Sequence, residues 1–143
     1  MSVDYTAARD FNGTETITYT VSDGTLTDET GTLTITVTAV DDAPVAVADT
    51  LTVDEDAALS SKDVIANDTD VDIGDTLSLT AATTSEAGTG SIVSINDDGL
   101  LNYTPAADFN GTETITYTVS DGTLTDATGT LTSTVTAVDD APV

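Results

Sequence analysis

Carboxylates are the only abundant side chains in this sequence that could do chemistry. The 143 residues include 26 Asp and Glu against 2 Lys and Arg, for a formal net charge of −24. The chain has no Cys, His or Trp. These absences exclude thiol and imidazole nucleophiles, imidazole bases, and metal sites built from nitrogen and sulfur. Arg9 and Lys62 are the only strong cations, so the chemistry left to the chain is that of oxygen ligands.

These carboxylates gather in short runs. Like charges so close together repel one another, and a divalent cation among them lowers that cost. Calcium suits such runs because it takes about six to eight oxygen ligands in flexible loops, whereas magnesium requires a stricter octahedron. The runs are Asp41-Asp42, Asp54-Glu55-Asp56, Asp68/Asp70/Asp72/Asp75, Asp97-Asp98 and Asp139-Asp140.

The segment NDTDVDIGDTL, residues 67–77, carries the densest pattern of acids. It differs from an EF-hand loop, because Gly74 falls one place late after Asp72 and Leu79 stands where that loop has its bidentate Glu. Spaced carboxylates on one loop still predict oxygen ligation by Asp68, Asp70 and Asp72.

The negative charge also excludes classes of partner. Phosphate backbones and anionic lipid headgroups would both be repelled. No apolar run approaches the length of a membrane-spanning helix, and the first residues do not read as a secretion signal. A glycosidase pair would need one carboxyl with a raised pKa in an apolar pocket, for which a thin sandwich has little room, so we expect no catalysis.

A long internal repeat organises the chain. Residues 4–45 and 102–143 align without a gap at an offset of 98 and differ at five positions. A period of this length fits one whole domain per repeat. We therefore expect residues 1–45 to be the last part of one repeat and residues 46–143 to be a complete one. The differing pairs are Asp4/Asn102, Ala7/Pro105, Arg9/Ala107, Glu29/Ala127 and Ile35/Ser133.

Hydrophobic residues alternate with Thr along two segments of each copy, TETITYTVSDG and GTLTITVTAV. This period of two predicts half-buried antiparallel strands. Further strands are expected near 46–53, 57–60, 77–82, 91–95 and 100–104, separated by Gly and Asp turns. About seven strands per repeat and no helical period predict an all-β, Greek-key sandwich of immunoglobulin-like type.

Two details bear on the core of this sandwich. Ser133 occupies the inward position held by Ile35 in the other copy, which should cost about 1–3 kcal/mol unless the hydroxyl finds a partner. The aromatic residues recur in both copies at inward or corner positions, where core packing is the expected use. They are Tyr5, Phe11, Tyr19, Tyr103, Phe109 and Tyr117.

Residues 1–45 cannot close a sandwich by themselves. Their apolar face must stay disordered, find another chain, or compete for the place of residues 102–143. Strand exchange or dimerisation through residues 1–45 is therefore expected as an alternative.

The motifs VDEDAAL, NDTDVDIGDTL, NYTPAADFNGTETITYTVSDG and VTAVDDAPV together resemble the cadherin-like, immunoglobulin-type repeats of large RTX-type bacterial surface adhesins secreted by type I systems. The resemblance covers nearly the whole chain. It implies an extracellular location at the cell surface, neighbouring repeats as partners, and calcium at the junctions between repeats.

The same resemblance divides the ligands between two junctions. Glu55 corresponds to an early Glu, Asp108 to a mid-domain Asp, and Asp121 to a late Asp before Gly. The junction within the chain would use Asp10, Asp41, Asp42, Asp68, Asp70 and Asp121. A junction to a following repeat would use Glu55, Asp108, Asp139 and Asp140.

Two functions follow as expectations. One is a calcium-stiffened spacer that projects a distal binding domain for cell adhesion or biofilm formation. The alternative is a module that contacts a carbohydrate, a protein or a surface such as ice through a Thr-rich sheet face.

Overall fold

The computed structural model describes residues 2–25, 29–85, 90–123 and 126–139, and within these ranges every regular element is a β-strand. The chain divides into two compact units, residues 1–41 and residues 42–143. Each unit is described separately. The boundary that the repeat predicts, between residues 45 and 46, stays a prediction.

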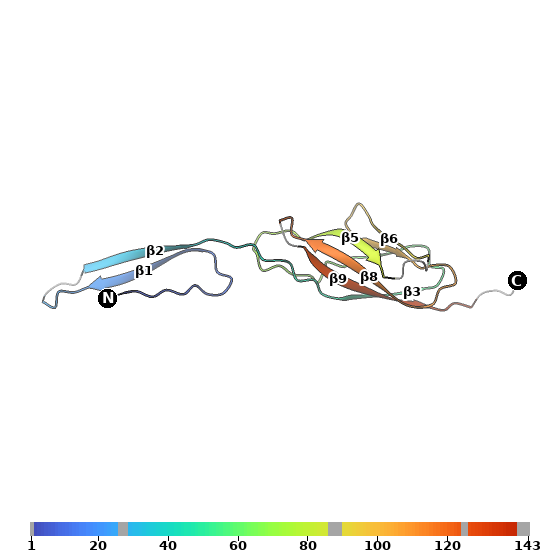
Figure 1. The fold of residues 1–143 in the computed structure, drawn as a ribbon, viewed down its shortest axis with the longest axis horizontal. Coiled ribbons are helices and arrows are strands. Elements are labelled where there is room, and N and C mark those ends of the chain that lie inside the picture. The colour runs from blue at the N-terminus through green and yellow to red at the C-terminus, as the bar shows by residue number, and fades with distance from the viewer. Residues whose placement is uncertain (1, 26–28, 86–89, 124–125, 140–143) are drawn as a thin grey trace. The chain divides into compact units, whose positions relative to one another are not determined.

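The first unit contains one antiparallel hairpin. Strands β1 (Gly13–Val21) and β2 (Glu29–Val37) pair along their whole lengths, from Gly13 opposite Val37 to Val21 opposite Glu29 (Figure 1). Thr stands opposite Thr on one face, and the other carries most of the apolar residues together with Glu15 and Glu29. This is the alternation of a sheet that is built to bury one of its two faces.

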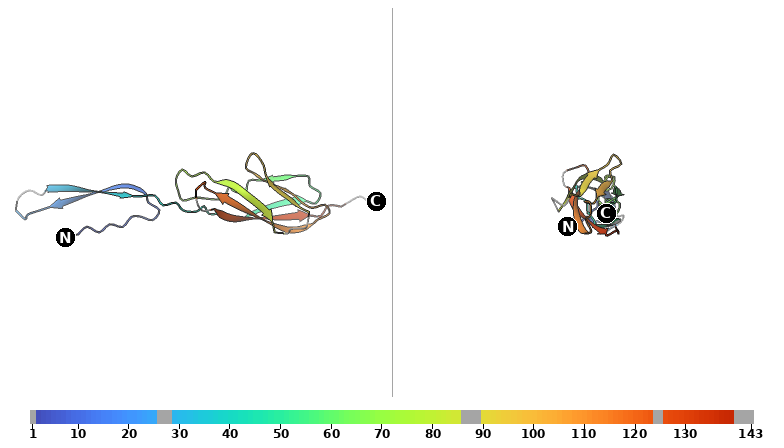
Figure 2. Two further views of the ribbon diagram at one scale, coloured as in Figure 1. Left: turned by 45° about the horizontal axis from the view of Figure 1, so that its top comes forward. Right: turned by 90° about the vertical axis from the view of Figure 1, so that its right-hand side faces the viewer.

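The second unit is a two-layered sandwich of seven strands. Its four-stranded sheet has the order β3-β9-β8-β5, and its three-stranded sheet has the order β4-β7-β6. The first strand of the unit, β3, lies parallel to the last, β9, while β5 and β8 pair antiparallel (Figures 1 and 2). The strands are β3 (Asp49–Asp54), β4 (Ser60–Lys62), β5 (Ser78–Thr84), β6 (Ile92–Ile95), β7 (Leu101–Thr104), β8 (Gly111–Ser120) and β9 (Ala127–Thr136).

The all-β, immunoglobulin-like and cadherin-like sandwich that the sequence predicts is therefore confirmed. The first and second expected strands differ in their bounds. Regular pairing begins at Asp49 instead of residue 46, because the segment 45–48 after Pro44 pairs with other backbone only at the isolated bridge Val45–Thr69. The short strand expected at 57–60 lies at Ser60–Lys62, after a turn at Glu55 and Asp56.

The core of the second unit is built from alternate residues of β7, β8 and β9. Tyr103, Ile115, Tyr117 and Leu131 have no exposed surface. The Tyr117 ring lies over Gly129, its cross-strand partner, in the space where a Cβ would otherwise stand. The core use expected for the aromatics holds for these tyrosines, and Phe109 packs against the same cluster.

The first unit departs from that expectation. Tyr19 is 43% exposed, although it too lies over its cross-strand glycine, Gly31. Phe11 and Tyr5 are only half-buried. Within residues 2–25 and 29–41 no second sheet covers the apolar side of the hairpin, so these rings lack the packing that the second sheet supplies to their counterparts.

Two polar side chains lie inside the sandwich core. Glu113 is 1% exposed, and its Oε2 accepts a hydrogen bond of 2.7 Å from the Tyr103 hydroxyl. Ser133, opposite Glu113 in the ladder, is fully buried, and its Oγ has no hydrogen-bond partner in the part of the chain that the structure describes. The expected cost of Ser133 is thus not offset by a hydroxyl contact there. Burial and the bond to Glu113 raise the pKa of Tyr103.

The core polar pair leads to a stability prediction. Tyr103→Phe should lower the free energy of unfolding by about 1–3 kcal/mol, because it removes a donor from a buried carboxylate. Ser133→Ala is the control, since it deletes a hydroxyl without a partner, and it should leave stability unchanged or raise it by about 1 kcal/mol. Urea unfolding followed by circular dichroism measures both. Equal losses in the two variants would contradict this account of the core.

Candidate metal centre

An acidic loop lies at the end of the sandwich where the chain enters it, here called the entry end. Val45 and Thr69 exchange backbone hydrogen bonds of 2.7 and 3.1 Å, which attaches the loop to the entering segment. The Val47 amide donates to Asp68 Oδ1 at 2.7 Å, and the Asp42 amide donates to Asp72 Oδ2 at 2.7 Å. The loop is therefore held by hydrogen bonds to its own carboxylates.

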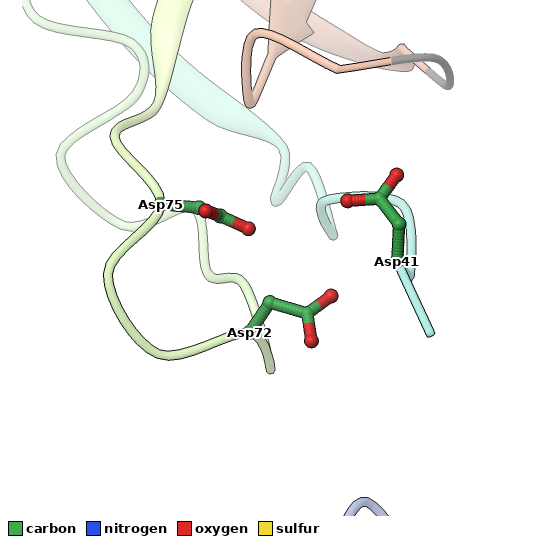
Figure 3. A group of neighbouring side chains, drawn as sticks. All are labelled: Asp41, Asp72 and Asp75. Atoms are coloured by element: carbon green, nitrogen blue, oxygen red, sulfur yellow. The ribbon is translucent and has the colours of Figure 1, made fainter. Parts of the chain in front are cut away.

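Three carboxylates converge at this end. Asp41, Asp72 and Asp75 each offer an oxygen, and these three oxygens lie within 4.8 Å of one another (Figure 3). Asp72 is half-buried, while Asp41 and Asp75 are exposed. A cation at such a point would touch three negative groups at once, as calcium does in protein loops.

A second group of carboxylates at the entry end is buried and only partly satisfied. Asp68 Oδ2, Asp70 Oδ2 and Asp121 Oδ2 are buried and have no hydrogen-bond partner among the described residues. Asp68 is 9% exposed and Asp121 is 7% exposed. Buried carboxylate oxygens are normally hydrogen-bonded or bound to an ion, so each of these unpartnered oxygens favours a cation nearby.

The other oxygen of each of these carboxylates is fixed. Asp68 Oδ1 accepts from Val47, Asp70 Oδ1 accepts from the Asp72 amide at 2.8 Å, and Asp121 Oδ1 accepts from the Thr123 amide at 2.7 Å. The Thr123 hydroxyl donates to the same Asp121 oxygen at 2.8 Å. Each carboxylate is thus held in place through one oxygen and presents the other without a partner.

Asp121 belongs to the same end of the sandwich as the acidic loop. It directly follows β8, and Ser120 at the end of β8 pairs with Ser78, three residues after Asp75. The hydrogen bonds from Thr123 hold the pKa of Asp121 below its usual range. The carboxylate is therefore kept in the charged form that binds a cation.

Tyr117 links this end to the core. Its hydroxyl donates to Val47 O at 3.0 Å and lies 3.4 Å from Asp49 Oδ2 and 3.4 Å from Asp68 Oδ1. Burial, followed by the charges of Asp68 and Asp49, raises the pKa of Tyr117. The Lys62 ammonium, 3.5 Å from Asp49 Oδ1, supplies the one basic side chain of the second unit.

The remaining predicted ligands lie elsewhere. At the opposite end of the sandwich, Glu55 is 8% exposed and accepts hydrogen bonds from the Val138 amide at 2.7 Å and from Asn110 Nδ2 at 3.1 Å. The Asp108 amide donates to Asp56 Oδ1 at 3.3 Å, and Asp139 is exposed. Asp140 lies outside the described residues.

Asp10 belongs to the first unit, where it lies 3.3 Å from Arg9 Nε. Its backbone is left-handed, with φ 57°, as is that of its copy Asp108, with φ 56°. Asp tolerates this conformation better than most residues because its short side chain bonds locally.

The structure thus brings together Asp41 and Asp72 of the predicted set, and adds Asp75 to them. Asp75 stands in the acidic run but not among the predicted ligands, and its spacing after Asp72 was the available signal. Which of these residues bind a cation stays a prediction.

The sequence matches two known families of bacterial domains. Residues 41–137 match the family described as bacterial cadherin-like domain. The chain belongs to the bacterial cadherin-like family. Residues 1–36 match the family described as bacterial Ig domain. None of the curated proteins matches the sequence.

Two solved structures are similar to this chain over part of their own length. One is described as the endo-fucoidan hydrolase MfFcnA4 from glycoside hydrolase family 107, at 23% identity and a TM-score of 0.45, over 90% of this chain and 19% of that one. The other, endo-fucoidan hydrolase MfFcnA9 from the same family, has 16% identity and a TM-score of 0.42, over 87% of this chain and 22% of that one. This chain therefore spans about a fifth of those proteins.

Membership of the family indicates the functional class of the domain and its cellular location. Bacterial cadherin-like and Ig domains are typically non-catalytic modules at the outer cell surface. Within the described ranges, no helix has the length and hydropathy that would cross a membrane.

The contacts of Tyr117 with Asp49 and Asp68 lead us to expect a loss of stability at high pH. An unfolded Tyr releases its proton near pH 10, whereas folded Tyr117 keeps it to higher pH. The native state then binds more protons than the unfolded state, so stability is complete below about pH 10 and falls above it, by at most about 1.4 kcal/mol per pH unit for this phenol.

Urea unfolding between neutral pH and pH 11 should show a shallower fall for Tyr117→Phe. Tyr19→Phe, in the first unit, is the matched control and should keep the wild-type slope. If stability falls with pH at the same slope in all three proteins, Tyr117 is not the group responsible.

Proposed function

We propose that this chain is a calcium-stabilised spacer from a bacterial cell-surface adhesin, which holds a distal binding domain away from the cell and so supports adhesion or biofilm formation. The observations that carry the proposal are the buried, unpartnered oxygens on Asp68, Asp70 and Asp121, together with the converging carboxylates of Asp41, Asp72 and Asp75. Membership of the cadherin-like family supports the same conclusion.

Electrostatics gives the reason for calcium. The second unit has only Lys62 to balance its acids, and that ammonium is engaged with Asp49. Carboxylates at the entry end therefore repel one another without a counter-charge from the protein. Calcium would supply it, since hard oxygen ligands in a flexible loop are the environment that this ion prefers.

A rigid entry segment is the mechanical result. The segment that leads into β3 is fixed to the loop at Val45 and Val47, and the loop carries the carboxylates. A cation bound there would tie entering chain and loop together, and so restrict bending where one repeat follows another. At the other end, Glu55 holds the segment after β9 through the Val138 amide, which sets the direction in which the chain leaves. Neighbouring repeats are the partners that this arrangement serves.

Calcium should therefore raise the melting temperature of the second unit. At about 1 mM calcium and a dissociation constant of about 10⁻⁴–10⁻³ M, binding to the native state adds roughly 0.4–1.4 kcal/mol per site. This corresponds to a rise of a few degrees for a domain of this size. Differential scanning calorimetry in calcium, compared with a chelator, measures the change.

Matched variants localise the effect. Asp70→Asn and Asp121→Asn each remove one charge and one unpartnered oxygen, and each should lose most of the calcium-dependent rise. Asp98→Asn removes the same charge from an exposed turn and should keep the rise. A melting temperature that is identical in calcium and chelator for the wild-type protein would refute the metal centre.

A second candidate function rests on the outer face of the four-stranded sheet. In a chain with net charge −24, three successive rows across this sheet carry only threonines. Such an uncharged, hydroxyl-bearing face is a surface that could dock a carbohydrate or an ordered layer of water. The rows are Thr52-Thr134-Thr112, Thr50-Thr132-Thr114 and Thr130-Thr116-Thr83.

A binding assay separates the two functions. The spacer function predicts no binding of the chain on a glycan array. It also predicts that calcium narrows the range of molecular dimensions seen by small-angle scattering. The docking face predicts glycan binding that Thr132→Lys abolishes and that Asp98→Asn leaves unchanged. Glycan binding that persists in Thr132→Lys would exclude this face.

A further inference from the structure

The chain contains the same hairpin twice. Strands β1 and β2 pair with the register Gly13–Val37 to Val21–Glu29, and strands β8 and β9 repeat that register, each residue 98 positions later. Register is set by the pattern of inward residues, so each residue of β1 and β2 faces the same way as its copy in β8 and β9. The two segments are structurally interchangeable.

Their surroundings differ. Tyr117, Val119 and Leu131 have no exposed surface in the sandwich. Their copies Tyr19, Val21 and Leu33 are 43%, 59% and 40% exposed. A hollow of about 590 Å³ lined by Val3, Tyr19 and Val21 lies on the hairpin of the first unit. Apolar surface that one copy buries is thus left in water by the other.

The place that β8 and β9 occupy would accept β1 and β2. It is formed by β3, which pairs with β9, by β5, which pairs with β8, and by Tyr103, which donates to Glu113. Glu15 is the copy of Glu113 and could accept the same hydrogen bond. The buried residues of β8 and β9 recur in β1 and β2 except that Ile35 stands in place of Ser133, and the half-buried Ala127 at the end of the ladder is replaced by Glu29.

The difference at Ser133 favours the incoming hairpin. Ser133 is fully buried with an Oγ that has no partner among the described residues. Ile35 would place an apolar side chain at this position, among Tyr103 and other core residues. At this position the exchanged state therefore removes a buried polar atom and adds an apolar side chain.

The hairpin cannot reach this place in its own chain. In the place of β9, Val37 would stand where Val135 stands, opposite Val53. The chain would then have to return along β3 to Asp42, which is fixed to Asp72. The four residues 38–41 give a reach of about 18 Å, and the return covers about 13 Å of β3 plus the open segment 42–48 that precedes it.

We propose that β1 and β2 of one chain replace β8 and β9 in the sandwich of a second copy, so that this chain forms strand-exchanged dimers or longer assemblies. The occupant of the uncovered hairpin face is thus residues 42–104 of another copy. The proposal does not depend on calcium.

Engineered disulfides test the exchange, because the chain has no cysteine of its own. Thr50 pairs with Thr132 in the sandwich, and Thr34 is the copy of Thr132. The double variant Thr34→Cys/Thr50→Cys should therefore form a disulfide between two chains after refolding in chelator at high protein concentration. Non-reducing electrophoresis and mass mapping of the linked peptides identify it. Thr50→Cys/Thr132→Cys reports the unexchanged sandwich as a positive control.

An interchain disulfide and an intrachain disulfide lead to opposite conclusions. A disulfide that joins positions 34 and 50 of different chains, with a yield that rises with protein concentration, supports the proposal. Adding Ile35→Ser should reduce that yield several-fold. A disulfide between positions 34 and 50 of one chain overturns the proposal. So does its absence when the Thr50→Cys/Thr132→Cys chain cross-links fully.

Discussion

Repulsion among carboxylates is the constraint on which the rest of this structure depends. The second unit folds a compact core while a single Lys opposes its acids, and that Lys is engaged with Asp49. Most of the described acids of this unit lie in the turns and loops outside the strands. Glu113 lies inside the core, where Tyr103 donates to it.

The two ends treat their acids differently. At the end where the chain leaves, the oxygens of Glu55 accept hydrogen bonds from protein groups. At the entry end, Asp68, Asp70 and Asp121 each keep one buried oxygen without a protein partner. The first arrangement satisfies these oxygens with protein groups, whereas the second leaves oxygens that a cation could satisfy. The asymmetry between the ends is therefore chemical as well as geometric.

Much of this fold could be predicted from the alternation of Thr with apolar residues. That pattern placed β8 and β9 and their first copies, because a period of two leaves no other way to bury Ile115 and Tyr117 together. Short strands such as β4 were placed less well, since turn residues around Glu55 and Asp56 decide where pairing resumes. Ser133 was recognised as a core position from its copy alone.

The candidate site was harder to predict. Acid spacing drew attention to Asp68, Asp70 and Asp72, but nothing in the spacing says which oxygen is already hydrogen-bonded. That depends on the amides of Val47 and of Asp72, which reach the loop only in the folded chain. Glu113 was missed, although its place in the inward phase of TETITYT could have revealed it.

The parallel pairing of β3 with β9 has a consequence for a chain under tension. These strands are the first and last of the sandwich and are joined along β3, from Asp49 opposite Leu131 to Asp54 opposite Thr136. A pull along the polypeptide enters at the start of β3 and leaves at the end of β9, so it slides the two strands past each other. Every hydrogen bond of that ladder then shares the load at the same moment, instead of opening one after another as in a zipper. The sandwich is thus arranged to resist stretching along the line of the chain.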